Sequence, residues 1–252
     1  MGSLGLKDKI FGHPGYSADL KMTADELARF RSAIRDQWLA TIRSEAPERA
    51  APFETIDIGS YHKLAGSLNH EKLWPKRNRV LPKSRALDIL GFDFVQRLRD
   101  ELGPFSVSDV VYDNHVETGR PEVYWRLVRP GQPTDVGPMH ADKWFHDIIG
   151  SDYGMPPGAV TIKLWIAVYC EAGRNGLLVV PDSHTRDWRY ERVMANGTEK
   201  PQIRENVDEL GAILVPTEAG TVLAFNERLL HGGAVNGGNS TRVSAEITLV
   251  FH

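Results

Sequence analysis

The stretch AVTIKLWIAVY, residues 159–169, decides the fold class of this chain. Side chains alternate between the two faces of a strand. One face of this stretch is therefore apolar throughout and predicts packing against a core: Ile162, Leu164, Ile166 and Val168. The other face carries Lys163 and Trp165, and such a mixed face is typical either of a wet pocket or of solvent. The strand alone leaves both interpretations open.

Similar runs, rich in Val, Ile, Tyr and Trp, recur from residue 105 onward between Gly and Pro turns. Candidate strands cover 107–113, 122–129, 159–169, 176–180, 212–215, 221–225 and 243–251. Little helix separates them, which favours an antiparallel sandwich or jelly roll over a βαβ sheet. In the last run, Arg242, Ser244 and Glu246 share one face, and the apolar residues share the other.

The first hundred residues have a helical pattern. Thr23 followed by Glu26 is a capping box, and an apolar stripe continues along one helix face through Leu27, Phe30, Ile34, Trp38 and Ile42. A second helix is predicted over Ala86–Leu102. We expect residues 1–104 to be a helical part of the same domain that supplies a lid and pocket walls, with the β core in residues 105–252.

Composition bounds the function. The chain has 252 residues, 41% hydrophobic and 25% charged, with a formal net charge of −3, so no basic excess points to nucleic acid or to an anionic membrane surface. No apolar run is long enough to span a bilayer or to act as a signal peptide. Cys170 is the single cysteine, so no intrachain disulfide can form. We expect a cytoplasmic protein, whose oligomeric state the sequence leaves open.

The stretch GPMHADKWFHD, residues 137–147, raises the question of a metal site. His140 and Asp142 are two positions apart, so on an extended segment both side chains point to the same side. His231, which follows an apolar strand, offers a third ligand. Two histidines and a carboxylate are the facial triad of non-haem Fe(II) oxygenases, and zinc can use the same donors. His146 and Asp147 are expected to be surface or rim residues.

Arg242 and Ser244 separate these metal chemistries. A guanidinium binds a carboxylate with two parallel hydrogen bonds, and a hydroxyl on the same strand face adds a third. A 2-oxo acid whose other end is a carboxylate could reach a metal and this pair together. That description fits 2-oxoglutarate.

These residues resemble the Fe(II)/2-oxoglutarate-dependent oxygenases, and most closely their phytanoyl-CoA dioxygenase-like branch. The resemblance rests on the triad, on Arg242 with Ser244, and on VVPDSH (179–184), KLWIAV (163–168) and GTVLAFNERLLHGG (220–233), and it covers about residues 105–252. In VVPDSH, Asp182 stands where the branch usually has Gly. No motif in the helical part matches a subfamily.

The resemblance implies a mainly β fold with α, a double-stranded β-helix (jelly roll, cupin-like barrel) with the N-terminal helices packed outside. It implies Fe(II), 2-oxoglutarate and O₂, with hydroxylation of a C–H bond and release of succinate and CO₂. Site roles carry over residue by residue: His140, Asp142 and His231 as catalytic metal ligands, and Arg242, Ser244, Trp165 and Lys163 around the co-substrate.

The expected substrate is a small polar metabolite, anionic or hydroxyl-rich. Candidate substrate-side residues are Tyr124, Arg126, Trp144 and Asn226. Pairing of the basic residues among them with Glu122 or Glu246 is an equally open interpretation. Two other functions also remain: a non-redox jelly-roll module that binds a metal or a sugar, and a zinc hydrolase on a cupin-like barrel.

Overall fold

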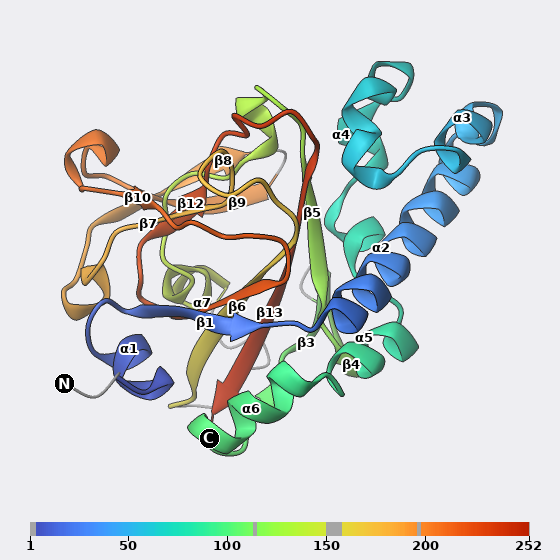
Figure 1. The fold of residues 1–252 in the computed structure, drawn as a ribbon. Helices are drawn as coiled ribbons and strands as arrows, with labels where there is room; N and C mark the ends of the chain where they lie inside the picture. The colour runs from blue at the N-terminus through green and yellow to red at the C-terminus, as the bar shows by residue number, and fades with distance from the viewer. Residues whose placement is uncertain (1–3, 113–114, 150–157, 196–197, 252) are drawn as a thin grey trace.

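Two β-sheets face each other at the centre of the molecule, and helices pack against the outside of the larger one (Figure 1). The computed structural model describes residues 4–112, 115–149, 158–195 and 198–251. The larger sheet runs β1–β11–β6–β13, and β13 is bordered on its other side by β5 and β2. All the named strand pairs are antiparallel. The predicted fold class, a β-rich jelly-roll architecture with helices outside, is confirmed.

The bounds of the strands are as follows. The larger sheet contains β1 (Tyr16–Lys21), β2 (Ser106–Val107), β5 (Tyr124–Val128), β6 (Val160–Tyr169), β11 (Thr221–Asn226) and β13 (Arg242–Phe251). The smaller sheet contains β10 (Ile213–Leu214), β7 (Leu177–Val179) and β12 (His231–Gly233). Two hairpins complete the set: β3 (Asp109–Tyr112) with β4 (His115–Pro121), and β8 (Tyr190–Ala195) with β9 (Thr198–Ile203).

The helices lie mainly before residue 103. The α-helices are α1 (Leu6–Phe11), α2 (Ala24–Glu45), α3 (Ala50–Glu54), α4 (His70–Leu73), α5 (Lys83–Ile89), α6 (Asp93–Leu102) and α7 (Lys143–Ile149). The 3₁₀ helices are η1 (Pro47–Arg49), η2 (Ile58–Lys63), η3 (Ala65–Ser67), η4 (Lys76–Arg79), η5 (Pro133–Asp135), η7 (Ser183–Thr185) and η8 (Val207–Glu209). None of the described helices combines the length and the apolar character needed to cross a membrane.

The longest helix forms as its sequence predicts. The hydroxyl of Thr23 accepts a hydrogen bond from the backbone of Glu26, and the Glu26 carboxylate accepts one from the backbone of Thr23. This capping box satisfies donors at the start of α2 that have no partner within the helix. Four residues of the predicted stripe are fully buried: Phe30, Ile34, Trp38 and Ile42.

One predicted helix, Ala86–Leu102, is wrong, because α5 and α6 are separate helices. Phe92 lies between them in an extended conformation and is 2% exposed. Its ring makes edge contacts with the rings of Phe30 and Phe94. The break therefore places a large aromatic side chain in the core. Glu26 stabilises the restart, since its carboxylate also accepts a hydrogen bond from the backbone N–H of Asp93.

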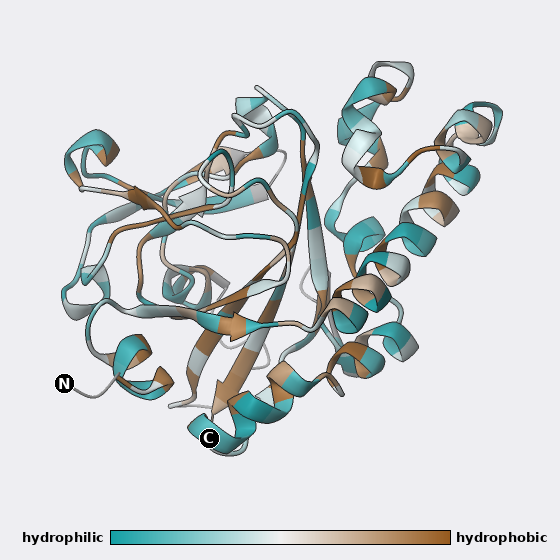
Figure 2. Cartoon of the chain, viewed as in Figure 1, coloured by the Kyte–Doolittle hydropathy of each residue, from teal (hydrophilic) through white to brown (hydrophobic). Residues whose placement is uncertain are grey.

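The main core lies between these helices and one face of the larger sheet. It combines Trp38 and Phe53 of the helical part with Leu164, Ile166 and Ile247 of the strands. Figure 2 shows the apolar segments of β1, β6 and β13 in this region. The predicted alternation in 161–169 and 243–251 therefore separates a core face from a second face, which looks toward the smaller sheet.

Several strands were missed by the sequence interpretation. β1 lies in the region expected to be helical, yet it pairs with β11 as an edge of the larger sheet. β4, β8, β9 and β12 were also absent from the prediction. The run 107–113 is divided between β2 and β3, and its last residue, Asp113, lies outside the described residues.

Candidate metal centre

The backbone brings two sequence-distant histidines side by side. The N–H of His140 donates to the carbonyl of His231 at 2.9 Å, and the N–H of His231 donates back at 2.8 Å. His231 begins β12, whereas His140 follows η5. Asp142 directly precedes α7, and its carbonyl accepts from the N–H of Phe145 in the first helical turn. A two-residue bridge and a helix start thus fix the three positions.

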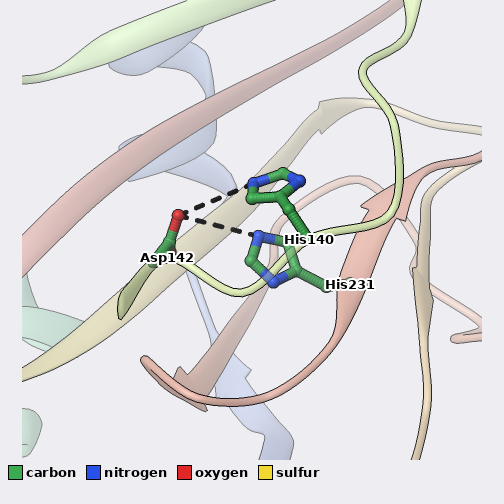
Figure 3. Close-up of side chains that lie close together, drawn as sticks. All are labelled: His140, Asp142 and His231. Carbon is green, nitrogen blue, oxygen red and sulfur yellow. Dashed lines mark ion pairs between the residues drawn. The ribbon is translucent and has the colours of Figure 1, made fainter. Parts of the chain in front are cut away.

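The three side chains converge on one point, as Figure 3 shows. The Nε2 of His140 is 3.8 Å and the Nε2 of His231 3.9 Å from Asp142 Oδ1. One ligand atom from each residue lies within 4.8 Å of the other two. His146, on α7, does not belong to this group. The predicted set of His140, Asp142 and His231 is therefore assembled in space.

Both imidazoles are oriented by the backbone. His140 Nδ1 lies 2.8 Å from the carbonyl oxygen of Pro138, and His231 Nδ1 lies 2.9 Å from that of Leu229. A carbonyl can only accept, so each Nδ1 carries the proton and donates it. Each neutral ring then presents a lone pair at Nε2, on the side of Asp142. This arrangement fixes the tautomer of a metal-binding histidine.

The electrostatics favour the protonation states that bind a metal. Burial, together with the charge of His231, lowers the pKa of His140 to about 4. Burial acts to raise the pKa of Asp142, but Lys163 and the two histidines outweigh it and hold that pKa at about 2. Metal ligands must be neutral imidazoles and an ionised carboxylate. At neutral pH, His140 and Asp142 are already in these forms.

One carboxylate oxygen of the site has no hydrogen-bond donor, which also fits the binding of a cation. Asp142 Oδ2 is buried and accepts no hydrogen bond. Its nearest described cation is the ammonium of Lys163, 3.9 Å away. A buried carboxylate oxygen without a donor is unfavourable unless a cation compensates it. Three ligands on one side would leave the remaining coordination positions of a divalent metal open toward the pocket.

A pocket between the two sheets opens beside the triad. Its walls come from both sheets and from the segment before His140, and its lining residues are Arg126, Asp135, Val136, Gly137, His140, Lys163, Trp165, Leu177, Phe225, His231, Gly232, Gly233, Arg242 and Glu246. All of them lie after residue 104. This lining therefore gives no support to the expectation that residues 1–104 supply pocket walls, and that expectation stays a prediction.

Arg242 has unused donors in this pocket. The side chain is 2% exposed, and its Nη1 donates to the carbonyls of Gly176 at 2.6 Å and Ala234 at 3.3 Å. Its Nε is buried without a partner, as is the hydroxyl of Ser244 on the same strand face. Burial lowers the pKa of Arg242 to about 10, which still leaves it charged at neutral pH. Two buried, unsatisfied donors fit a carboxylate ligand.

A glycine in the pocket lining, Gly233, packs closely against the segment before His140. A Cβ at Gly233 would lie 3.1 Å from Val136 Cγ1 and 3.5 Å from Arg242 Nη2. A Cβ there would crowd Val136, in the segment before His140, while its distance from Arg242 is that of an ordinary van der Waals contact. The second glycine of the His-Gly-Gly sequence at residues 231–233 thus has a steric reason.

The two β6 residues predicted near the co-substrate line the pocket. The guanidinium carbon of Arg242 lies 5.8 Å from the ring centroid of Trp165. Lys163 Nζ donates to Thr248 Oγ1 at 3.0 Å and forms the ion pair with Asp142. The mixed face of residues 161–169 is accordingly pocket-facing at these two positions.

The substrate-side candidates are placed differently from one another. Arg126 lines the pocket, but its guanidinium is paired with Glu246 at 2.6 Å, as one of the two interpretations had it. The other three do not line the pocket. Tyr124 packs against basic residues, Trp144 stacks on Tyr190 at 4.8 Å, and the Asn226 amide oxygen accepts from the N–H of Arg228.

Sequence reasoning missed part of the lining. Phe225, whose ring centroid is 4.6 Å from that of His231, could have been found from strand alternation in 221–225. Asp135 carries no such signal. Its carboxylate is held by Arg129, with contacts of 2.7 and 2.9 Å, and these two residues meet only through the turn at η5.

Comparison with known proteins places the chain in a family. The family model described as phytanoyl-CoA dioxygenase (PhyH) matches residues 15–244. The chain belongs to this family. The predicted resemblance is thus confirmed, and it extends into the helical part that carried no recognisable motif. The family and the ligand geometry also support the predicted cofactor set of Fe(II), 2-oxoglutarate and O₂ for a non-haem oxygenase.

Solved structures show the same fold at low sequence identity. AviO1 from Streptomyces viridochromogenes Tue57 is 15% identical, with a TM-score of 0.55, over 100% of this chain and 97% of that one. EctD from S. alaskensis is 15% identical, with a TM-score of 0.54, over 96% and 75%. SnoK, a non-haem α-ketoglutarate-dependent carbocyclase from nogalamycin biosynthesis, is 14% identical, with a TM-score of 0.52, over 99% and 87%. No curated protein matches the chain.

Proposed function

We propose that this protein is an Fe(II)- and 2-oxoglutarate-dependent dioxygenase that hydroxylates a C–H bond of a small polar metabolite, with release of succinate and CO₂. The observation that carries the proposal is the combination of the His140, Asp142 and His231 cluster with the unsatisfied donors of Arg242 and Ser244 in one pocket region. Membership of the PhyH family supports it.

In this proposal each residue has a defined task. His140, Asp142 and His231 would hold Fe(II), which when bound would activate O₂, the oxidant, with 2-oxoglutarate as the co-reductant. Arg242 and Ser244 bind the far carboxylate of 2-oxoglutarate and so orient its 2-oxo acid end toward the triad. The rings of Phe225 and Trp165 line the pocket between the triad and Arg242, and in this proposal they exclude water from it. Polar walls formed by Arg126, Glu246 and Lys163 support a polar rather than a long-chain substrate.

The other two functions lack a supporting observation. A non-redox module leaves the buried donors of Arg242 and Ser244 without a task. A zinc hydrolase needs a general base, and the two other carboxylates of the pocket are already engaged, Glu246 by Arg126 and Asp135 by Arg129. We therefore propose the oxygenase alone.

Anaerobic titration tests the proposal. Fe(II) followed by 2-oxoglutarate is expected to give a weak visible charge-transfer band, and O₂ is then expected to yield succinate. Asp142→Ala should abolish the band and metal binding, because two imidazoles alone hold a metal poorly. Asp147→Ala, the neighbouring exposed acid, is the matched control and should keep both. A wild-type protein that binds metal but gives neither band nor succinate contradicts the proposal.

A further inference from the structure

An ion pair, Arg126 with Glu246, lies on the larger-sheet side of the pocket. Arg126 is on β5 and Glu246 on β13, and the register of these strands places Arg126 opposite Ser244, two residues from Glu246. Both side chains line the pocket, and the Nε of Arg126 donates to Glu246 Oε1 at 2.6 Å. Burial acts to raise the pKa of Glu246, but the charge of Arg126 outweighs it and lowers that pKa. At neutral pH the pair is therefore a carboxylate beside a guanidinium.

This pair uses only part of its hydrogen-bonding capacity. Among the described residues, no hydrogen bond reaches Nη1 or Nη2 of Arg126 or Oε2 of Glu246. None of these atoms is enclosed by the protein, and the two side chains are 34% and 16% exposed. The pair thus presents donors and an acceptor side by side to the pocket.

The other polar side chains of the lining are occupied or already have a task. The triad and Arg242 serve the metal and the co-substrate in the proposed function. Both oxygens of Asp135 accept from Arg129, and the ammonium of Lys163 is held by a hydrogen bond and an ion pair. Within the described part of the lining, the Arg126–Glu246 pair therefore has open positions and no assigned task.

The pair also lies in the part of the pocket that a substrate must enter. On β13, Glu246 is followed two residues later by Thr248, which is paired with Lys163 of β6. The Lys163 ammonium in turn lies 3.9 Å from Asp142 of the triad. A molecule that contacts the pair is therefore within two strand positions of the residue that contacts a metal ligand.

The open groups decide which substrate chemistry fits. A substrate carboxylate on Arg126 would also meet Glu246, and a substrate ammonium on Glu246 would also meet Arg126, and such like-charge contacts are unfavourable. A hydroxyl group both donates and accepts, so it satisfies the two residues at once. We propose that Arg126 and Glu246 together bind an uncharged hydroxyl group of the substrate, with Arg126 donating and Glu246 accepting. This inference rests on the proposed function and assigns to it a neutral, hydroxyl-bearing substrate.

Three sugars that share one ring and differ in charge test the inference: glucose, glucuronate, and glucosamine in its ammonium form. Each is titrated calorimetrically into the full-length protein, loaded anaerobically with Fe(II) and saturating 2-oxoglutarate. Wild type is expected to bind glucose about tenfold or more tightly than either charged sugar, because each charged sugar meets a like charge of the pair.

Single substitutions should change this preference in opposite directions. Glu246→Gln leaves Arg126 without its carboxylate and should shift the preference from glucose toward glucuronate. Arg126→Gln leaves Glu246 without its guanidinium and should shift the preference toward glucosamine, each shift being about tenfold or more. The double variant has no charge at either position and should favour neither charged sugar over the other. Opposite shifts cannot arise from a general loss of stability.

A matched ion pair outside the pocket is the control. Arg192→Gln and Glu199→Gln each break an exposed pair on the β8–β9 hairpin and should keep the wild-type preference. No glucose binding by wild type, or one order of the three sugars in wild type and both single variants, overturns the inference.

Two further outcomes separate this inference from the proposals on which it rests. A loss of 2-oxoglutarate affinity in Arg126→Gln as large as that in Arg242→Gln also overturns it, because Arg126 would then belong to the co-substrate site. Absence of the Fe(II)·2-oxoglutarate band in wild type before any sugar is added instead contradicts the proposed function, so the two failures are distinguishable.

Discussion

At the scale of single residues, Arg242 is the group on which co-substrate binding depends. Arg242→Gln removes the charged fork but keeps a side chain of similar reach. We expect 2-oxoglutarate binding to weaken by about 10- to 100-fold, because hydrogen bonds to a charged group contribute roughly 1.5–3 kcal/mol. The dissociation constant from the anaerobic band measures it. Metal binding without 2-oxoglutarate should be unchanged, and a variant with wild-type 2-oxoglutarate affinity would refute the assignment.

His70 connects the pocket wall to the helices. Trp74 Nε1 donates to the Tyr61 hydroxyl at 3.0 Å, so that hydroxyl is free to donate to His70 Nδ1, 2.9 Å away. The proton of the neutral ring is then on Nε2, which lies 3.7 Å from the Asp135 carboxylate. Burial lowers the pKa of His70 to about 4, despite the opposing charge of Asp135.

This lowered pKa predicts a pH dependence of stability. Below pH 6.5 the unfolded chain protonates His70 while the folded chain does not, so stability falls as the pH decreases from 6.5 toward 4. The slope contributed by one such histidine is at most about 1.4 kcal/mol per pH unit. His70→Gln should therefore lose less stability than wild type between pH 7 and pH 5, measured by urea unfolding of the metal-free protein. His13→Gln, at an exposed ring, is the control, and identical slopes for wild type and His70→Gln would contradict the prediction.

Residue-scale prediction from the sequence succeeded where spacing alone carries the chemistry. Arg242 and Ser244 lie two apart on β13, where strand alternation places both on one side, and His140 and Asp142 lie two apart in the segment that leads into α7. The partners of the basic residues could not be chosen in advance. Whether Arg126 meets Glu246 depends on the register of β5 against β13, which pairs Arg126 with Ser244 and Tyr124 with Glu246.

At the scale of elements, Glu26 holds two helix starts together. Its carboxylate accepts from the backbone of Thr23 at the start of α2 and from that of Asp93 at the start of α6. Thr23→Ala removes one half of the capping box and should cost about 1 kcal/mol of unfolding free energy. Glu26→Ala should cost more, roughly 2–3 kcal/mol, because two backbone N–H groups in part-buried hydrogen bonds lose a charged acceptor.

Urea unfolding of both variants measures these costs, with Asp25→Ala, an exposed acid in the same turn, as the control. Equal losses for Thr23→Ala and Glu26→Ala would show that the link to α6 contributes nothing.

Helices and strands with a full periodic pattern of apolar residues were predictable from the sequence. Strands that form only by pairing with another strand far along the chain were not. α2, β6 and β13 each show a complete apolar face in the sequence. β12 has three residues, two of them glycine, and becomes a strand only by pairing with β7. β1 likewise becomes an edge of the larger sheet through β11, an association far along the chain that no local pattern shows.

At the scale of the whole molecule, we propose that the helical part and the β core form one cooperative domain. A single buried cluster joins Trp38 and Trp74 of the first part to Trp125 of the second, and β1 supplies a strand of the larger sheet. Unfolding followed by far-UV circular dichroism and by tryptophan fluorescence should give coincident transitions. Two separated transitions would show that residues 1–104 unfold on their own.

The division of β6 and β13 into two faces has a consequence for divergence and for engineering. The face that packs on the helices maintains the scaffold, while the opposite face carries Lys163, Trp165, Arg242 and Glu246. Substitutions at positions of the second face that are not proposed to hold the metal or the co-substrate are expected to change ligand preference without disturbing the packed layer. Those positions are therefore the target for redesign.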